Sequence, residues 1–165
     1  MSIIEMSQAL YDSEIGTGIR ESIYAYPAIE GLHLLSLAFS VGLIVLTDLR
    51  LVGLFLRDVP AADILRQLRP WVLGGFAVQL VTGVLLFWAS AATVIELPVF
   101  WLKLLVIFIA GLNVLWFELK WVRRVGDWGN QIAPPSGVKL AGWASLAFWC
   151  VVVISGRLIP YLSYK

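Results

Sequence analysis

Four long apolar blocks, separated by polar segments, constrain the fold of this chain more than any other feature. They lie at about residues 28–50, 71–91, 98–118 and 138–160. Each approaches the roughly 20 apolar residues with which an α-helix crosses the hydrocarbon core of a bilayer. The chain is 60% hydrophobic, above the roughly half that is usual in soluble domains. The sequence therefore predicts an all-α fold, a polytopic four-helix membrane bundle forming one domain over residues 1–165.

The segment before the first block has a different pattern. Apolar residues within 1–26 recur at helical spacing among acidic ones, which predicts short amphipathic helices on the membrane surface or over the bundle. A free tail is the alternative. Gly16 and Gly18 predict a break within this segment, and the lack of a basic region before an apolar core predicts no cleaved signal peptide. After the first block, residues 60–69 predict a short amphipathic helix ended by Pro70.

Basic residues are sorted between the two sides of the predicted bundle. Eight lie in or beside the segments that follow the first and third blocks: Arg50, Arg57, Arg66, Arg69, Lys120, Arg123, Arg124 and Lys139. Three lie near the opposite surface: Arg20, Arg157 and Lys165. This asymmetry places the two long loops in the cytoplasm and both termini outside, in a bacterial inner (plasma) membrane. The net charge of +1 gives no general attraction for nucleic acid.

His33, the only histidine, lies early in the first apolar block with Glu30 one turn before it. At about 1.5 Å of rise per residue, Lys103 and Arg157 lie at a similar depth in other helices. Ionisable groups in a bilayer are tolerated when they pair or face a cavity. We therefore predict an outer-leaflet polar cluster of Glu30, His33, Lys103 and Arg157. In the alternative, the two basic side chains extend to the interface.

A second polar layer lies at the cytoplasmic edge of the blocks. It contains Asp48, Arg50, Glu118 and Lys120, with Asn113 one turn deeper. The segment Asp48-Leu-Arg50 is expected to pair across to Glu118 and Lys120. A solvated rim that only sets the topology is the alternative.

Three interpretations of His33 remain open at this point. It is a structural histidine hydrogen-bonded within the polar layer, a ligand of haem b or of a metal, or a proton relay or quinone-site donor. Helix bundles hold haem between helices, but haem b in membranes usually takes two histidines and this chain supplies one. A partner would have to provide the second. Cys150, the only cysteine, excludes an internal disulfide and is expected to be a small, buried apolar residue. Neither a metal-binding pattern nor a catalytic motif occurs in the sequence.

Short motifs along nearly the whole chain resemble those of a known family. They are Tyr26-Pro27, Glu30-x-x-His33, Asp48-Leu-Arg50, Ala110-Gly-Leu-Asn113 and Ser155-Gly-Arg157. The chain resembles small bacterial four-span inner-membrane proteins of unknown function, which are loosely similar to cytochrome b and copper-resistance D-type bundles. In that family a histidine often follows the phenylalanine of the third helix. Glu118 occupies this position here, so a haem site that relied on that histidine would be lost.

The expected function is a non-enzymatic membrane subunit or anchor with a polar outer-leaflet site around His33, in a redox or transport assembly. One alternative is a b-type haem electron carrier that uses His33 as a ligand. Another is a small proton-coupled transporter that uses the same polar layer. The expected partners are the lipid bilayer and either further copies of the chain or another membrane subunit.

Overall fold

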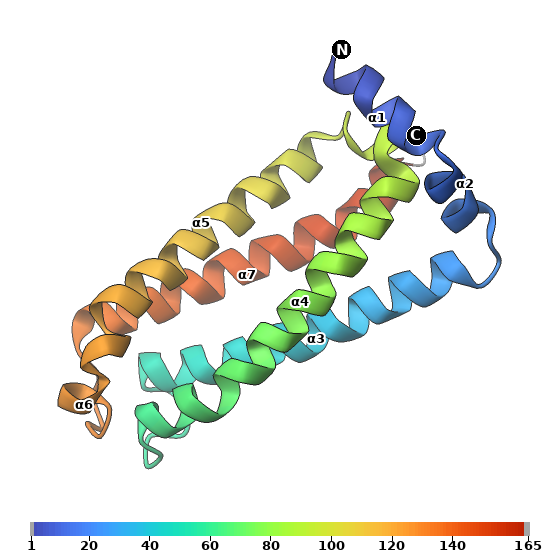
Figure 1. The fold of residues 1–165 in the computed structure, drawn as a ribbon. Coiled ribbons are helices and arrows are strands. Elements are labelled where there is room, and N and C mark those ends of the chain that lie inside the picture. Colours follow the sequence, from blue (N-terminus) through green and yellow to red (C-terminus); the bar gives the residue numbers. More distant parts are fainter. Residues whose placement is uncertain (1, 164–165) are drawn as a thin grey trace.

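The computed structural model describes residues 2–163, which contain helices and no strand (Figure 1). Among these residues, four helices are long and apolar enough to cross a membrane. They are α3 (Ala25–Val52), α4 (Ala61–Val94), α5 (Pro98–Lys120) and α7 (Ser136–Ser163). The short elements are α1 (Ile3–Tyr11), α2 (Glu14–Glu21), η1 (Val122–Arg124) and α6 (Val125–Trp128). The predicted all-α architecture with four apolar helices is confirmed. Lys165, counted above on the outer side, lies outside the described residues.

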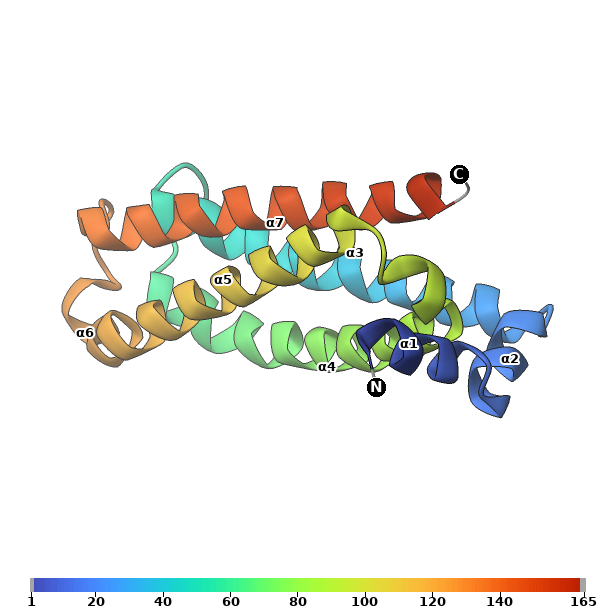
Figure 2. The ribbon, with the colours of Figure 1, turned by 90° about the horizontal axis from the view of Figure 1, so that it is seen from above.

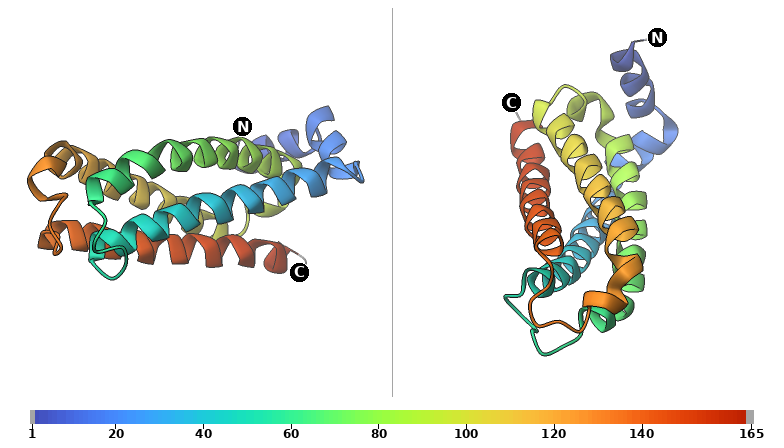
Figure 3. Two further views of the ribbon diagram at one scale, coloured as in Figure 1. Left: turned by 90° about the horizontal axis from the view of Figure 1, so that it is seen from below. Right: turned by 90° about the vertical axis from the view of Figure 1, so that its left-hand side faces the viewer.

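The spanning helices are neighbours in the order α4, α3, α7, α5. Helix α3 packs along both α4 and α7, while α5 packs along α7 (Figures 1 and 3). Helix α7 is the most enclosed, because one-third of its 18-residue apolar window is buried, against 11% in each of the other three. The rest of the helical surface is apolar and exposed, as expected where lipid is the solvent.

The connections are divided between the two ends of the bundle (Figure 2). The α3–α4 loop, η1 and α6 lie at one end, and we call this the loop end. The N-terminal helices, the α4–α5 loop and the end of α7 lie at the other. The two loops rich in basic residues therefore share one end, and their placement in the cytoplasm remains a prediction.

The N-terminal segment forms two helices, and the break between them was predicted at the wrong place. It falls at Asp12 and Ser13, and both Gly16 and Gly18 lie inside α2. Ser13 caps α2, because its hydroxyl oxygen accepts a hydrogen bond from the Gly16 N–H at 3.1 Å. The same oxygen accepts one from Trp88 Nε1 at 2.9 Å, which joins the segment to α4. The two predicted placements for these helices were on the membrane surface or over the bundle. Helices α1 and α2 pack against α4 and so cover the bundle.

Arg20 fastens this segment at a break in α4. Its guanidinium donates to the carbonyl of Tyr11 at 3.0 Å and to that of Ala89 at 3.2 Å. It also lies 3.7 Å from the centre of the Tyr11 ring. The next residue of α4, Ser90, leaves helical geometry with φ −128° and ψ 19°. Arg20 therefore supplies a charged donor to a backbone carbonyl beside the break.

The start of α4 also differs from the prediction. Pro70 lies inside the helix instead of ending a shorter one. A proline inside a helix leaves the carbonyl four residues earlier without its donor, and Arg66 is exposed, so water reaches its carbonyl. Ala61 and Ile64 anchor the first turns of α4, since they are 1% and 7% exposed. Pro160 likewise lies within α7 instead of closing it.

Two apolar clusters form the core. At the loop end, the buried residues are Leu51, Ala61, Phe117, Trp128, Val138 and Ala141. In the middle of the bundle they are Val106, Ala110, Trp149 and Val152. The Phe76 ring of α4 reaches the middle cluster, with its centre 5.1 Å from that of Trp149. Each cluster thus joins helices that are far apart in the sequence.

Candidate functional site

His33 lies in the third turn of α3 and faces α4. Its Nδ1 lies 2.8 Å from Thr82 Oγ1, and its Nε2 lies 2.7 Å from Gln79 Nε2. The Ser36 hydroxyl donates to Gln79 Oε1 at 2.7 Å. We call these four side chains, His33, Ser36, Gln79 and Thr82, the His33 network. It joins α3 to α4 within the membrane-spanning part of both helices.

The proton positions in the His33 network follow from the orientation of the Gln79 amide. Because the Gln79 amide donates to Nε2 of His33, that nitrogen carries the lone pair of a neutral imidazole. The ring proton is then on Nδ1 and is donated to Thr82 Oγ1. The Thr82 hydroxyl in turn donates to the Val78 carbonyl at 2.7 Å. Both ring nitrogens are satisfied inside the chain, which is what a buried polar group requires in lipid.

Small residues allow α3 and α4 to approach closely at this point. A Cβ atom at Gly83 would lie 3.2 Å from His33 Cε1, and one at Gly75 would overlap the Ser40 hydroxyl. These two glycines are eight residues apart, so they share a face of α4.

A haem ligand needs a free imidazole nitrogen directed at the iron. Each nitrogen of His33 instead takes part in a hydrogen bond with α4, and Gly83 lies against the ring edge. The residues present therefore do not fit axial ligation, because iron could bind only after one of these bonds was given up. Haem b at His33 stays a prediction.

The predicted outer-leaflet cluster is brought together only in part. The Lys103 side chain of α5 lies across Gly156 of α7, within electrostatic reach of His33. Arg157 is exposed, and its guanidinium lies 5.6 Å from the centre of the Tyr161 ring. Within residues 2–163, Glu30 forms no ion pair with either base. Lys103 is thus the one predicted partner whose charge acts on His33.

Asp48 and Asn113, from the predicted cytoplasmic-edge cluster, line a hollow of about 40 Å³. Asp48 is 5% exposed, and its Oδ2 has no hydrogen-bond partner among the described residues. Ser145 of α7 lines the same hollow. Asn113 Nδ2 donates to the Ala141 carbonyl at 3.1 Å. The side-chain oxygen of Asn113, Oδ1, is left to accept from other donors. The lining is mainly apolar, with polar groups from Asp48, Asn113 and Ser145, and it leaves room for ordered water.

Two other members of that cluster bind elsewhere. Arg50 is 1% exposed, and it donates from Nε to the Val59 carbonyl at 2.7 Å and from Nη2 to the Gln131 carbonyl at 3.1 Å. It therefore joins both long loops to α3. Glu118 pairs with Arg69 of α4 at 2.9 Å. The predicted layer is divided among a loop anchor, an interhelical ion pair and a small hollow.

Sequence reasoning missed Gln79, which is central to the His33 network. One signal for it was present: Gln79 is the only carboxamide in the block 71–91 and lies three residues before Thr82, so both share a face of the helix. His33 and Ser36 show the same spacing on α3. Two such pairs on neighbouring apolar helices are typical of interhelical hydrogen bonding.

Comparison with known proteins identifies a family for this chain. The model of a family described as "Family of unknown function (DUF6644)" matches residues 4–162. The chain belongs to this family. No curated protein and no solved structure matches it.

The DUF6644 match extends over all four spanning helices and most of the N-terminal segment. The resemblance to an uncharacterised family is therefore confirmed. A bacterial origin and a likeness to cytochrome b or copper-resistance D-type bundles stay predictions. In this member of DUF6644, the Glu118 carboxylate that follows Phe117 is engaged with Arg69 at the loop end, whereas His33 lies in the part of α3 towards the other end.

Proposed function

We propose that this multi-pass membrane protein is a non-enzymatic subunit or anchor of a membrane assembly. One observation carries the proposal: both ring nitrogens of the only histidine are used to hold α3 against α4. An imidazole bound in this way positions helices, whereas a catalytic or ligating imidazole needs a free nitrogen. The arrangement supports the structural interpretation of His33.

Two more polar side chains are also used in holding the fold together. Arg50 binds two loop carbonyls, and Glu118 pairs with Arg69. Polar groups inside a membrane protein commonly join helices in this way. The Arg50 guanidinium is directed inward, whereas the Glu118–Arg69 pair is half-exposed at the loop end.

Helix α5 offers a face to a partner. Among the four spanning helices it packs along α7, and its other side exposes a ridge of Leu105, Phe108, Leu112 and Leu115. Gly111 lies within this ridge and has no neighbouring atom within 4 Å of a Cβ built on it. A small residue in an exposed apolar ridge permits close approach of another helix. We propose that a partner helix, from a second copy or another subunit, packs here.

The test uses a bulky residue that the isolated fold tolerates. We expect Gly111→Ile to melt like the parent protein in detergent but to lose the larger species that the parent forms in native gels of mildly solubilised membranes. Gly42→Ile is the matched control, because Gly42 of α3 also has open space around it. If the parent protein migrates at the mass of a single chain in its native membrane, the subunit proposal fails.

The haem alternative is tested on the same material. A Soret band in the purified protein that disappears in His33→Leu would show ligation and would replace the structural role proposed here. We expect no His33-dependent band, before or after haem is supplied.

A second candidate is a small proton-coupled carrier, favoured by the polar interior of α3. Ser36, Ser40 and Asp48 are buried at helical spacing on the side that bears His33, and Lys103 approaches that histidine. If this function holds, Lys103→Met and Glu30→Gln each abolish proton flux in proteoliposomes while the protein melts normally. Normal flux in both variants would eliminate it.

A further inference from the structure

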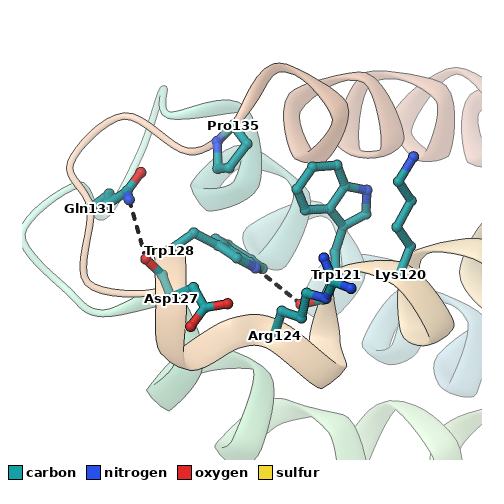
Figure 4. Close-up of a pocket in the computed structure, with 7 residues that line it drawn as sticks. All are labelled: Lys120, Trp121, Arg124, Asp127, Trp128, Gln131 and Pro135. Carbon is teal, nitrogen blue, oxygen red and sulfur yellow. Dashed lines mark hydrogen bonds between the residues drawn. The ribbon is translucent and has the colours of Figure 1, made fainter.

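A hollow of about 300 Å³ lies at the loop end, where α5 gives way to η1 and α6 (Figure 4). Its lining combines two indoles with side chains of both charges: Lys120, Trp121, Arg124, Asp127, Trp128, Gln131 and Pro135. A volume of this size is at the lower end of the range for small-molecule sites.

Buried contacts fix the walls of this hollow. Trp128 is 3% exposed, and its Nε1 donates to the Trp121 carbonyl at 3.0 Å. The Trp128 ring also packs edge-on against Phe117, with ring centres 6.3 Å apart. The Trp121 ring lies against Gly137 of α7 so closely that a Cβ there would overlap it. The aromatic lining is therefore preformed and does not depend on a ligand.

The charges in the hollow are separated from one another. Arg124 and Asp127 both line it, yet neither forms an ion pair with any described residue. Figure 4 shows their side chains on the same side of the Trp128 indole, apart from each other. Lys120 adds a second cation, and its Nζ lies 5.6 Å from the centre of the Trp121 ring. A ligand that carries an anion and a cation a few bonds apart matches this pattern.

The depth of the hollow identifies the source of such a ligand. It begins where α5 ends at Lys120, which is the level of lipid headgroups if α5 spans the bilayer. Along the neighbouring turns, α5 exposes Trp116 and Leu119, while α7 exposes Leu140 and Trp143. These side chains offer an apolar surface to acyl chains directly beside a polar hollow.

We propose that this hollow binds the headgroup of a zwitterionic phospholipid. Arg124 and Lys120 bind the phosphate through charge-assisted hydrogen bonds. Asp127 binds the ammonium group, and the indole faces of Trp121 and Trp128 add cation–π attraction. The inference requires that the chain spans a membrane and is independent of the role of His33.

Native mass spectrometry of the detergent-purified full chain, with equal amounts of phosphatidylethanolamine and phosphatidylglycerol added, tests the proposal. We expect the parent protein to retain phosphatidylethanolamine in preference to phosphatidylglycerol. Arg124→Gln should weaken its binding about tenfold, as loss of a charge-assisted phosphate contact would. Asp127→Asn should remove the preference while phosphatidylglycerol still binds. Lys120→Gln removes the other proposed phosphate contact and should likewise weaken the binding of phosphatidylethanolamine.

Arg66→Gln and Asp63→Asn are the matched controls, because they make the same charge changes at exposed positions of α4. They should leave lipid binding unchanged. Equal retention of both lipids by the parent protein, or an unaltered preference in Asp127→Asn, would overturn the proposal. So would complete displacement of the lipid by soluble phosphoethanolamine at comparable concentration, because a free headgroup would then be the better description of the ligand.

Discussion

Gly75 of α4 lies directly against Ser40 of α3, and a single added methyl group at Gly75 would overlap the Ser40 hydroxyl. Ser40 itself is 1% exposed, so its side chain has little room to move. The separation of the two helices is therefore set at this pair by the absence of a side chain.

We accordingly expect Gly75→Ala to destabilise the protein by about 1–3 kcal/mol, the usual cost of overpacking. The adjacent variant, Gly74→Ala, is the matched control, because Gly74 has open space around it. It should be neutral or stabilise α4 by up to about 1 kcal/mol through helix propensity. Thermal unfolding in detergent measures both, and equal melting temperatures would contradict the close contact.

The His33 network predicts a specific pattern of coupling. His33→Leu and Gln79→Leu should each cost about 1–3 kcal/mol, because each leaves a buried polar partner unsatisfied. The double variant should cost less than the sum of the two. The Ser36 hydroxyl still reaches the carbonyl of residue 33, and that of Thr82 still reaches Val78. A double-mutant cycle by thermal unfolding should show a coupling of about 0.6–2 kcal/mol. Strict additivity would show that the network contributes nothing as a unit.

Arg50→Lys should loosen both long loops at once. A lysine has one nitrogen in place of the guanidinium fork that spans the carbonyls of Val59 and Gln131. We expect a loss of about 2–4 kcal/mol, together with faster proteolysis within residues 53–60 and 129–135. Arg66→Lys, at an exposed position, is the control. Protection of both loops in Arg50→Lys at the parent level would contradict the anchor.

Asp48→Asn should not destabilise the protein. The Asp48 carboxyl is buried with one oxygen unpartnered, and a neutral amide of the same shape is easier to desolvate. We expect the free energy of unfolding to rise by about 1 kcal/mol. Asp63→Asn, which removes one partner of a half-exposed ion pair, should change the free energy of unfolding by less than about 0.5 kcal/mol. A marked loss of stability in Asp48→Asn would show that the carboxylate charge is bound by something in its hollow.

The fold was largely predictable because hydrophobic length reports directly on membrane crossing. Apolar runs located all four spanning helices, but not their ends. Pro70 was predicted to end a short helix. The helix instead continues through Pro70, because its first turns are held by the burial of Ala61 and Ile64 against other segments. The N-terminal break was assigned to Gly16 and Gly18, yet the cap at Ser13 determines it. Tertiary contacts and capping decided these boundaries, and neither is visible in hydropathy.

The site was predictable in part. Depth along the helices predicted that Lys103 and His33 lie near the same end of the bundle, and their positions in α5 and α3 agree with this. A cluster of the two side chains stays a prediction. Rotation about the helix axes was not predicted, and it determines that His33 faces Gln79 and Thr82 of α4 instead of Glu30 or Arg157. Arg50 was expected to pair across to Glu118, but its acceptors are backbone carbonyls in loops. Patterns of side chains contain no information about such partners.

The contact between Arg20 and Ala89 has a consequence for the order in which the chain assembles. Sixty-nine positions separate the two residues, so the N-terminal helices leave the ribosome long before the carbonyl they bind exists. They cannot dock until two spans have been inserted and α4 has acquired its break at Ser90. Docking of α1 and α2 therefore follows completion of the α3–α4 hairpin.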